Sequence, residues 1–400
     1  MTILVSGLTL HNNKGGPALA MSLRDIVQKE FQNAKIVMSV PRTLYGLEEE
    51  EKWAKHYHID RVFPSVGVKV LLSKILFNKK YRIQRGMFKK DLEGIDLIID
   101  LNALSYMDLE NLSFKQNMIR NLNIYTLRYF SNLWRIPMIR WTQSYGPFKY
   151  YITQQLVKHD LKNQGNIFVR GVNSYKNISK LCPDKKIYSF PDIAISLEQN
   201  SEYYQKNLLN KRYVSLSPSS VIYSMKKENY IHEFRKIIEH LLSKNIDIVL
   251  VPHNMMYKNA NLYNCDLKVS EEIIKSIQSK QLHIVNEDLD VYTLKGIIAN
   301  AHIHIGSRYH SIIASLSSAV PTIAFSWHEK YIDIMRMYEM HKYVHEKDDV
   351  IDDILEKIDT LLVTRHQTHL TLKSKQIDLL AEIEKNMKLC MENYNDLQSL

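Results

Sequence analysis

The chain has 400 residues, of which 45% are hydrophobic and 24% charged, and its formal net charge at pH 7 is +10. This composition is ordinary for a soluble globular protein, and the length exceeds a single hydrophobic core, so we expect two domains. No run of 18 or more apolar residues is present, which argues against a membrane span. The cysteines Cys182, Cys265 and Cys390 lie far apart and predict no disulfide framework, as expected in a reducing cytosol. The first residues read as a strand rather than as a secretory signal.

The positive charge is concentrated in residues 61–90, which contain nine Lys or Arg and no acidic residue. Apolar residues alternate with these charges, and Val70, Leu71, Ile75 and Phe77 form the expected apolar stripe. A basic amphipathic segment of this kind suits an anionic bilayer surface or an anionic lipid-linked substrate. The alternative is the solvated face of an ordinary helix, and both interpretations stay open. Nucleic acid is disfavoured because no recognition motif accompanies the charge.

Strands and helices alternate along the first half of the chain, which is typical of parallel sheets. The predicted strands are residues 3–6, 35–40, 96–101, 137–143 and 166–170, and the predicted helices are residues 17–31, 111–130, 148–162 and 173–181. The pattern is lost between residues 190 and 211, where polar residues predict a connection between domains.

The second half restarts the same alternation. The predicted strands are residues 213–217, 247–252, 283–285 and 301–305, and the predicted helices are residues 228–243, 270–279 and 291–299. Apolar residues spaced by three and four then follow one face of a long helix over residues 374–397. We therefore expect two Rossmann-like domains, residues 1–190 and 191–370, that face each other across a cleft, and a C-terminal helix, residues 371–400, that crosses back.

Three features of the first half are candidates for a ligand site. The turn after the first strand contains Lys14, Gly15 and Gly16, which would let the backbone approach an anion, although a plain tight turn is the alternative. Asp100 ends a buried strand and is expected to face the cleft or to cap the next helix. Arg170 ends another strand, where it would point into the cleft or form a surface salt bridge.

The second half carries the most informative pattern, Gly306-Ser307-Arg308-Tyr309-His310. It follows a strand and opens a helix, so Arg308 and His310 lie two residues apart at the carboxyl end of a parallel strand, where ligands bind in open α/β sheets. A helix start also favours anions. Ser217 and His253 follow two other strand ends, and a structural role is the alternative for His253. No histidine falls in a metal-binding spacing.

Together these pieces resemble the polysaccharide pyruvyl transferase family over most of the chain. The resemblance rests on Asn13-Lys14-Gly15-Gly16 with Ala18-Leu19, residues 96–100 with Ser105 and Asp108, Gln143-Ser144 with Gly146-Pro147-Phe148, Val169-Arg170 with Ser174, Pro191-Asp192, Val251-Pro252-His253, and Ser307-Arg308 with His310 through Val320-Pro321 to Lys330. These motifs occur in this order and at strand ends.

The resemblance implies a two-domain fold of the glycosyltransferase-B type, with the acceptor side in residues 1–190 and the donor site in residues 191–370. It implies transfer of pyruvate from phosphoenolpyruvate to a sugar of a cell-surface or exopolysaccharide precursor, with a cyclic ketal as product and phosphate released. The expected partners are phosphoenolpyruvate, a free or lipid-linked sugar acceptor and an anionic membrane contacted peripherally. The expected location is the cytoplasm or the inner face of the cell membrane, and no cofactor or metal is required.

The same resemblance assigns roles to the candidate residues. His310 would be the general acid and base, Arg308 and Arg170 would hold the anionic groups, and His253 would support them. Asp100 would be a base on an acceptor hydroxyl. The remaining residues expected to contact substrate are Lys14, Gly15, Gly16, Ser217, Ser307 and Lys330.

Two alternatives from other classes remain. One is a glycosyltransferase that uses a nucleotide sugar, for which Glu329 is the acidic residue placed to hold a ribose. The other is a non-catalytic scaffold in polysaccharide assembly that uses the basic segment. Against the scaffold, the chain keeps both Arg308 and His310, which an inactive relative would lose first.

Overall fold

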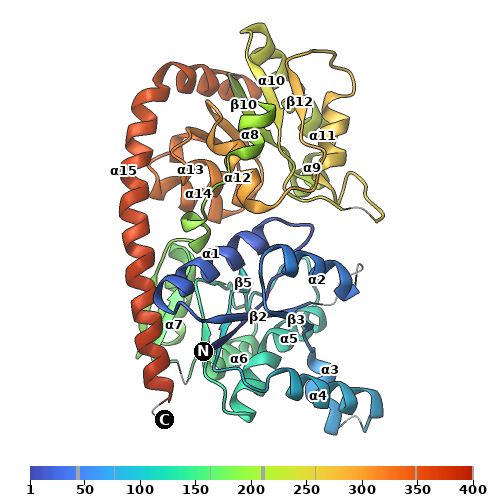
Figure 1. Ribbon diagram of the computed structural model, residues 1–400, viewed down its shortest axis with the longest axis vertical. Coiled ribbons are helices and arrows are strands. Elements are labelled where there is room, and N and C mark those ends of the chain that lie inside the picture. Colours follow the sequence, from blue (N-terminus) through green and yellow to red (C-terminus); the bar gives the residue numbers. More distant parts are fainter. Residues whose placement is uncertain are drawn as a thin grey trace. The chain divides into compact units, whose positions relative to one another are not determined.

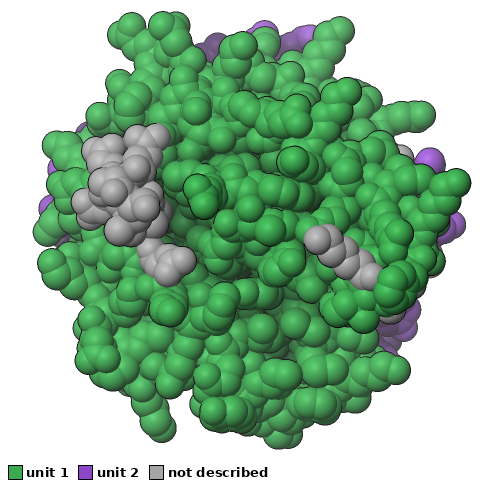
Figure 2. All heavy atoms as spheres, turned by 90° about the horizontal axis from the view of Figure 1, so that it is seen from below, with its two compact units in different colours: residues 1–11, 23–193, 382–400 green, residues 12–22, 194–381 purple. Residues whose placement is uncertain are grey.

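The computed structural model describes residues 1–41, 46–75, 77–162, 164–208, 212–256, 258–346 and 349–398 (Figure 1). The chain divides into two compact units. Unit 1 contains Met1–His11, Leu23–Ile193 and Glu382–Leu400, and unit 2 contains Asn12–Ser22 and Ala194–Ala381 (Figure 2). The domain ranges expected from the sequence lack this exchange of short segments. Residues 12–22 group with unit 2 because Lys14 donates a backbone hydrogen bond to His253 and Asn13 pairs with Asn254.

Unit 1 is built on a parallel sheet in the order β3-β2-β1-β4-β6. The strands are β1 (Thr2–Ser6), β2 (Lys35–Val40), β3 (Arg61–Pro64), β4 (Leu97–Asp100) and β6 (Met138–Arg140). Two small parallel pairs accompany it, β5 (Leu104–Ser105) with β7 (Ser144–Tyr145) and β8 (Asn166–Val169) with β9 (Lys186–Ser189). The central strands β1 and β4 are apolar except at their ends, because both faces of such a sheet are covered.

The helices of this part of the chain are α1 (Gly15–Glu30), α2 (Gly46–His56), α3 (Val68–Leu71), α4 (Lys79–Asp91), α5 (Phe114–Leu133), α6 (Tyr151–Leu161) and α7 (Val172–Leu181), with the 3-10 turns η1 (Leu72–Lys74) and η2 (Ile193–Ser196). The structure corrects the sequence analysis between residues 46 and 91, where α2, β3, α3 and α4 were not predicted as separate elements. It also corrects the expected apolar stripe, because Val70 is 4% exposed and packs in the core with Phe88 and Phe130.

Unit 2 contains a parallel sheet in the order β12-β11-β10-β13-β14-β15. The strands are β10 (Tyr213–Ser217), β11 (Asp247–Leu250), β12 (Leu282–Ile284), β13 (His304–Gly306), β14 (Thr322–Phe325) and β15 (Val344–His345). The helices are α8 (Glu202–Asn207), α9 (Ser220–Lys226), α10 (Glu228–Ser243), α11 (Asp266–Ile274), α12 (Val291–Ala299), α13 (Tyr309–Leu316) and α14 (Glu329–Met337), with the 3-10 turn η3 (His341–Tyr343). This strand order is that of a Rossmann fold.

The last helix, α15 (Ile351–Gln398), begins well before the predicted start at residue 374. Ile354, Ile358 and Leu361 are fully buried and continue the apolar stripe toward the N-terminus of the helix. Residues up to Ala381 group with unit 2 and the following ones with unit 1. Within the described part of the chain, no helix combines the length and the apolar character needed to cross a membrane.

The order of strands creates one switch point in each unit. In unit 1, β1 has β2 on one side and β4 on the other, and Ser6 is in register with both Ser39 and Asp100. In unit 2, β10 lies between β11 and β13, and Ser217 is in register with Gly306. At such a point, neighbouring loops leave the carboxyl edge of the sheet in opposite directions and open a crevice in which ligands bind.

Candidate functional site

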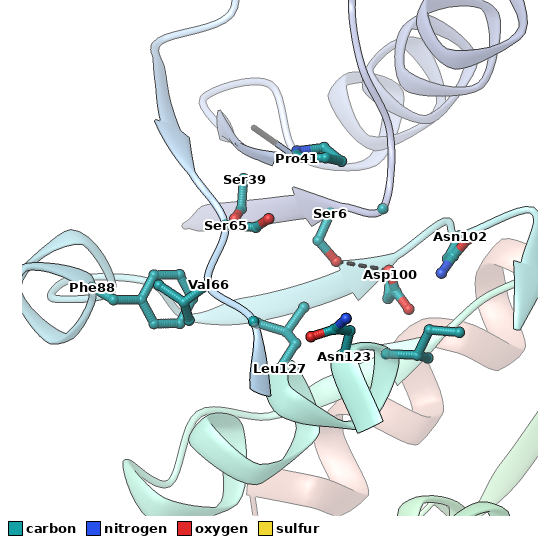
Figure 3. Close-up of a pocket in the computed structure, with 13 residues that line it drawn as sticks. Ser6, Ser39, Pro41, Ser65, Val66, Phe88, Asp100, Asn102, Asn123 and Leu127 are labelled. Carbon is teal, nitrogen blue, oxygen red and sulfur yellow. Dashed lines mark hydrogen bonds between the residues drawn. The ribbon is translucent and has the colours of Figure 1, made fainter. Parts of the chain in front are cut away.

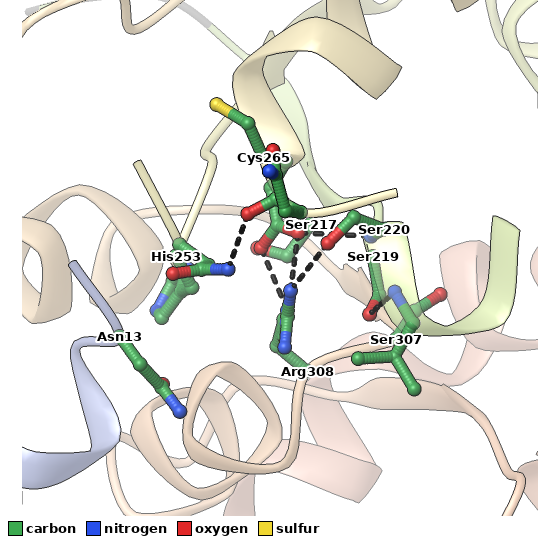
Figure 4. A network of polar contacts seen from close by, with 12 residues as sticks. Asn13, Ser217, Ser219, Ser220, His253, Cys265, Ser307 and Arg308 are labelled. Carbon is green, nitrogen blue, oxygen red and sulfur yellow. Dashed lines mark hydrogen bonds and ion pairs between the residues drawn. The ribbon is translucent and has the colours of Figure 1, made fainter. Parts of the chain in front are cut away.

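The polar residues singled out in the second half of the sequence gather at the switch point of unit 2. Ser217 ends β10, His253 follows β11, and Ser307 and Arg308 follow β13 (Figure 4). These three strands are neighbours in the sheet, so their carboxyl ends lie together. Asn13 lies beside them, because the first turn of the chain belongs to this unit.

Arg308 is held rigidly at this edge. It is the N-cap residue of α13, and its Nε and Nη2 atoms donate to the two carboxylate oxygens of Asp266, at 2.7 and 2.5 Å. Nη2 also donates to Ser220 Oγ at 2.9 Å. Burial lowers the pKa of the Arg308 guanidinium, but the Asp266 carboxylate outweighs burial and the pKa is raised. The cation is therefore permanent, and its plane is fixed by the two-pronged pairing with Asp266.

One guanidinium nitrogen of Arg308 remains available. Its Nη1 atom makes no hydrogen bond to any residue that the structure describes, and the side chain keeps 13% of its surface exposed. Asp266 itself is fully buried at the first position of α11 and also accepts from the Ser220 amide at 2.9 Å. The sequence analysis missed Asp266, which follows no predicted strand.

His310 lies in the first turn of α13 and packs against the first turn of the chain. A Cβ atom on Gly15 would lie 2.3 Å from His310 Nδ1, so only glycine fits beside this imidazole. The Asn13 side chain accepts from the Gly15 amide at 3.1 Å and fixes the turn. The sequence predicted that the backbone of this turn lies close to a ligand site. In the structure, that backbone directly approaches His310.

The surroundings of Lys14 differ from the expectation that this residue contacts an anionic substrate. Its side chain is 2% exposed, and its Nζ lies 2.5 Å from a carboxylate oxygen of Asp288, so its charge is balanced within unit 2. Gly16 donates its amide to Asn13 O at 3.2 Å as the turn closes. Both residues shape the loop that carries Gly15.

His253 is a neutral imidazole at this site. Burial lowers its pKa to about 4, and its Nδ1 is 3.1 Å from Val251 O. Near neutral pH it cannot supply a proton as an imidazolium ion. Its assigned part in the chemistry is therefore limited to hydrogen bonding and packing beside Arg308.

The serine hydroxyls at the strand ends are used internally. Ser217 Oγ donates to Val251 O at 2.9 Å, and Ser307 Oγ accepts from the Tyr230 hydroxyl at 2.7 Å. Both serines are fully buried, and the Ser307 amide donates to Ser217 O at 2.9 Å. They join β10, β11 and β13 at the carboxyl edge, and their assignment to substrate contact stays a prediction.

Lys330 adds a second cation next to α13. It lies in the first turn of α14, with its Nζ 4.9 Å from the centre of the Tyr309 ring, 5.3 Å from Trp327 and 5.6 Å from Tyr331. The Tyr331 hydroxyl donates to Ser307 O at 3.1 Å, which ties this aromatic cluster to the strand end. Cation–π contacts of this kind hold an ammonium in place beside the aromatic rings.

The other two predicted site residues belong to unit 1. Arg170 is buried and forms an ion pair with Asp192, and it also donates to Ala103 O at 3.0 Å and Ser144 Oγ at 3.3 Å. Its assignment as an anion holder stays a prediction, and the structure adds that its guanidinium joins several loops of unit 1.

Asp100 is 4% exposed and heavily hydrogen-bonded. Its carboxylate forms an ion pair with Arg140 and accepts from Gln143 Nε2 at 2.8 Å and Ser6 Oγ at 2.8 Å. These contacts hold the carboxylate at the carboxyl edge of β4. Its assignment as a base on an acceptor hydroxyl stays a prediction.

A cavity of about 470 Å³ opens at the switch point of unit 1 (Figure 3). It lies at the carboxyl ends of β1 to β4, and its polar lining consists of hydroxyls, amides and one carboxylate. The residues are Ser6, Ser39, Ser65, Asp100, Asn102 and Asn123, beside the apolar Val66, Phe88, Ile124 and Leu127. None of the described lining residues is cationic. Neutral hydrogen-bonding groups beside apolar surface suit a neutral polyhydroxy ligand rather than an anion.

A metal site is not formed by the described residues, among which no group of three or more His, Cys, Asp or Glu is arranged to hold an ion.

The fold is shared with solved structures of very low sequence identity. UDP-GlcNAc 2-epimerase from Neisseria meningitidis, bound to UDP-GlcNAc, superimposes with a TM-score of 0.63 at 12% identity, covering 99% of this chain and 100% of that one. The 2-epimerase from Methanocaldococcus jannaschii gives 0.58 at 11% identity, covering 90% and 93%. A ugt transferase from Siraitia grosvenorii in complex with UDP gives 0.56 at 9% identity, covering 100% of both chains. These proteins share the two-domain glycosyltransferase-B architecture, which confirms the predicted fold class.

Sequence comparison identifies the chain more narrowly. No curated protein matches it at a significant level. The family model described as polysaccharide pyruvyl transferase matches residues 13–329, from the turn that packs on His310 to the start of α14. Because the match spans most of the chain and includes the Arg308 and His310 edge, the protein belongs to the polysaccharide pyruvyl transferase family.

Proposed function

We propose that the donor of this transferase is phosphoenolpyruvate, and that its pyruvyl group becomes a ketal across two hydroxyls of a sugar in a polysaccharide precursor. The observation that carries the proposal is the Asp266-clamped Arg308, followed two residues later by His310 in the first turn of α13. A fixed guanidinium beside an imidazole is what an anionic substrate that needs a proton requires.

Phosphoenolpyruvate would bind through its two anionic groups. Arg308 Nη1 offers a donor on one side, and the Lys330 ammonium of α14 lies beside the Tyr309 ring of α13. The positive end of the helix dipole adds to this attraction. Arg170 stays a candidate for a further contact with the donor.

The proton step belongs to His310. Its imidazolium form donates a proton to the methylene carbon of the enol phosphate, which becomes a methyl group and leaves oxocarbenium character on the central carbon. A first sugar hydroxyl adds to that carbon and loses its proton. The carbon–oxygen bond to phosphate then breaks, phosphate leaves with one proton, and the second hydroxyl closes the ketal ring. One hydroxyl proton thus replaces the proton given by His310, and the scheme needs neither cofactor nor metal.

The acceptor sugar would occupy the cavity of unit 1. Its serine hydroxyls and asparagine amides can bind the hydroxyls of one sugar ring, and Phe88 and Leu127 provide apolar surface for the ring face. Asp100 would orient an acceptor hydroxyl through a hydrogen bond. An oxocarbenium centre is strongly electrophilic, so the attacking hydroxyl can lose its proton as the bond forms, without a strong base.

The acceptor of this reaction would be met at the inner face of the cell membrane, as a lipid-linked oligosaccharide. This location is supported by the excess of basic residues in unit 1 between residues 61 and 90.

The test is phosphate release from phosphoenolpyruvate with a panel of soluble and lipid-linked galactosides, glucosides and N-acetylhexosamines. Acceptor-dependent phosphate release, with a product heavier by one pyruvyl ketal in mass spectrometry, is the expected result. Turnover of a UDP-sugar with no response to phosphoenolpyruvate would overturn the proposal in favour of a glycosyltransferase. Absence of turnover with every donor would favour the scaffold.

A further inference from the structure

Unit 1 exposes large apolar side chains within its most basic segment. Phe77 is 80% exposed, Ile75 72%, Met87 62% and Ile83 54%. They lie in α4 and in the turn that leads into it, and α3 packs beside α4 (Figure 1). Burying these side chains inside unit 1 would be favourable. Exposed apolar groups of this size are typical of a surface that binds a partner.

Helix α4 has two apolar faces with different surroundings. Phe88 on the inner face is 2% exposed and packs edge-on against Phe63 and Phe130, at ring distances of 6.0 and 5.7 Å. Ile83 and Met87 are four residues apart and therefore share another face. The inner face accounts for the folding of α4, and the outer pair makes no contribution to that core.

Cations surround the outer apolar pair. Among the described side chains from α3 to the end of α4, the exposed basic residues are Lys69, Lys79, Lys80, Arg82, Lys89 and Lys90. None of them forms an ion pair with an acidic residue in the described part of the chain. Arg82 lies over the Phe77 ring, with its guanidinium carbon 5.6 Å from the ring centre. An ordinary solvated helix face carries mixed charges and few large apolar groups. The outer face of α4 differs, because its charges are all positive and it exposes large apolar side chains.

We propose that these residues, Ile75, Phe77, Ile83 and Met87 with the six exposed cations, form a docking surface for an anionic lipid bilayer. The term docking surface refers to this set below. Apolar side chains would enter the region between headgroups and acyl chains while Lys and Arg contact the anionic headgroups. A protein partner would also need complementary shape, whereas a bilayer needs only this combination of charge and exposed apolar groups. The apolar anchor thus keeps Ile75 and Phe77 of the stripe expected from the sequence, whereas Val70 is buried, and Ile83 and Met87 are added.

The docking surface adjoins the cavity of unit 1. Val66 and Gly67 precede α3, Phe88 belongs to α4, and all three line the cavity. A bilayer bound to the outer face of α4 would thus lie one helix away from the cavity. This last step rests on the proposed function, because it makes the cavity the place where a membrane-anchored sugar arrives.

The experiment is flotation of the full chain with vesicles of neutral phosphatidylcholine or of phosphatidylcholine mixed with phosphatidylglycerol, at low and high salt. Binding to anionic vesicles only, weakened by salt, is expected. The variant Lys79→Gln/Lys80→Gln/Arg82→Gln should lower the partition coefficient by on the order of 100-fold. The variant Ile83→Ser/Met87→Ser should lower it by about 10-fold.

Matched controls come from the exposed face of α15. Lys373→Gln/Lys385→Gln/Lys388→Gln removes the same charge, and Val363→Ser/Ile377→Ser removes exposed side chains of similar kind, at 86% and 64% exposure. Both control variants should bind vesicles as the unmodified chain does. Circular dichroism checks that all variants are folded.

Three results would overturn docking: no flotation with anionic vesicles at low salt, equal losses in the control variants, or full vesicle binding by the Ile83→Ser/Met87→Ser variant. In the last case, binding to a soluble sulfated dextran would assign the surface to an anionic polymer. Phosphate release with a soluble acceptor is measured on the same samples. If the unmodified chain does not float but releases phosphate, docking alone is refuted, whereas flotation of the unmodified chain without turnover refutes the proposed function alone.

Discussion

In both units the first strand lies between the second and the fourth, yet the side chains at the two switch points differ in charge. The edge of unit 2 presents Arg308 and Lys330, with His310 beside them. The edge of unit 1 presents hydroxyls, amides and a carboxylate around a cavity, and its buried cation Arg140 faces Asp100 within the protein. The same backbone topology can thus receive an anion in one unit and a neutral polyhydroxy ligand in the other. The fold therefore indicates where a ligand binds, and the charge of the side chains at that place indicates which kind of ligand binds.

The two units also bury polar groups in different protonation states. Unit 1 contains Asp160, where burial raises the carboxyl pKa but Arg140 and Arg128 outweigh burial and lower it. Unit 2 contains the neutral histidines His253 and His304, whose pKa values burial lowers to about 4 and about 3. Both units bury charged pairs, such as Asp160 with Arg140 in unit 1 and Asp266 with Arg308 in unit 2, but the buried neutral imidazoles of unit 2 predict that it responds to milder acid.

The largest effect is expected from His310→Ala in unit 2. Losing a general acid should lower kcat by about 10²–10⁴-fold, because the methylene carbon would have to take its proton from water. Phosphate release from phosphoenolpyruvate measures the loss. The control is His341→Ala, which removes an exposed histidine of the same unit and should leave kcat unchanged. Full turnover by the His310→Ala variant would show that another group donates the proton.

The second expected effect separates the units by pH. His253 and His304 take up protons more readily when unfolded, at the ordinary histidine pKa near 6.5, so their contribution is complete above pH 6.5 and is lost as pH falls toward 4. For His253 the shift corresponds to about 3 kcal/mol of unfolding free energy. The lowered pKa of Asp160 makes its contribution complete above its ordinary value of 3.8, and it is lost only as pH falls below that value.

Hydrogen exchange resolved by peptide is the measurement for this difference. Between pH 6.5 and 4.5, peptides from β10, β11 and β13 should lose protection while peptides from β4 and β6 keep it. Equal loss in both units would show that the buried histidines do not decide acid stability.

A third expectation concerns Arg308→Lys. A lysine keeps the charge but cannot contact both Asp266 oxygens and an anion at once, so kcat/KM for phosphoenolpyruvate should fall by roughly 10–100-fold. Steady-state kinetics with phosphoenolpyruvate varied at saturating acceptor give the value. Arg336→Lys, an exposed exchange in α14, is the matched control. An unchanged KM for phosphoenolpyruvate together with an unchanged kcat would place the donor elsewhere.

The smallest effect is expected in unit 1, from Asn102→Ala at the edge of the cavity. Removing one hydrogen bond to a neutral sugar should raise the KM for acceptor by about 3–10-fold and leave the KM for phosphoenolpyruvate unchanged. The pair of KM values measured in one experiment is the readout. A rise in the phosphoenolpyruvate value instead would reverse the assignment of donor and acceptor to the two units.

Much of the fold followed from local patterns in the sequence. The central strands β1, β4 and β10 are apolar runs bounded by turn residues, and the predicted helices α5 and α10 carry clear helical periodicity. The segment between residues 46 and 91 was harder, because charged residues dominate its helices and their apolar faces are narrow. There, the choice of buried face depends on Phe63 and Phe130, which lie far from α4 in sequence.

The sequence by itself determined the family, the alternation of strands and helices, and the Arg308 and His310 pair, because each is carried by residues close together in the chain. Only the tertiary structure decided which groups those residues meet. Asp266 reaches Arg308 across 42 positions, and Gly15 reaches His310 from the opposite end of the chain. Likewise, Arg170 forms an ion pair with Asp192. Burial lowers the pKa of the His253 imidazole, which is therefore neutral near pH 7. Charge balance and desolvation depend on distances in space, and these distances cannot be read from the spacing of residues along the chain.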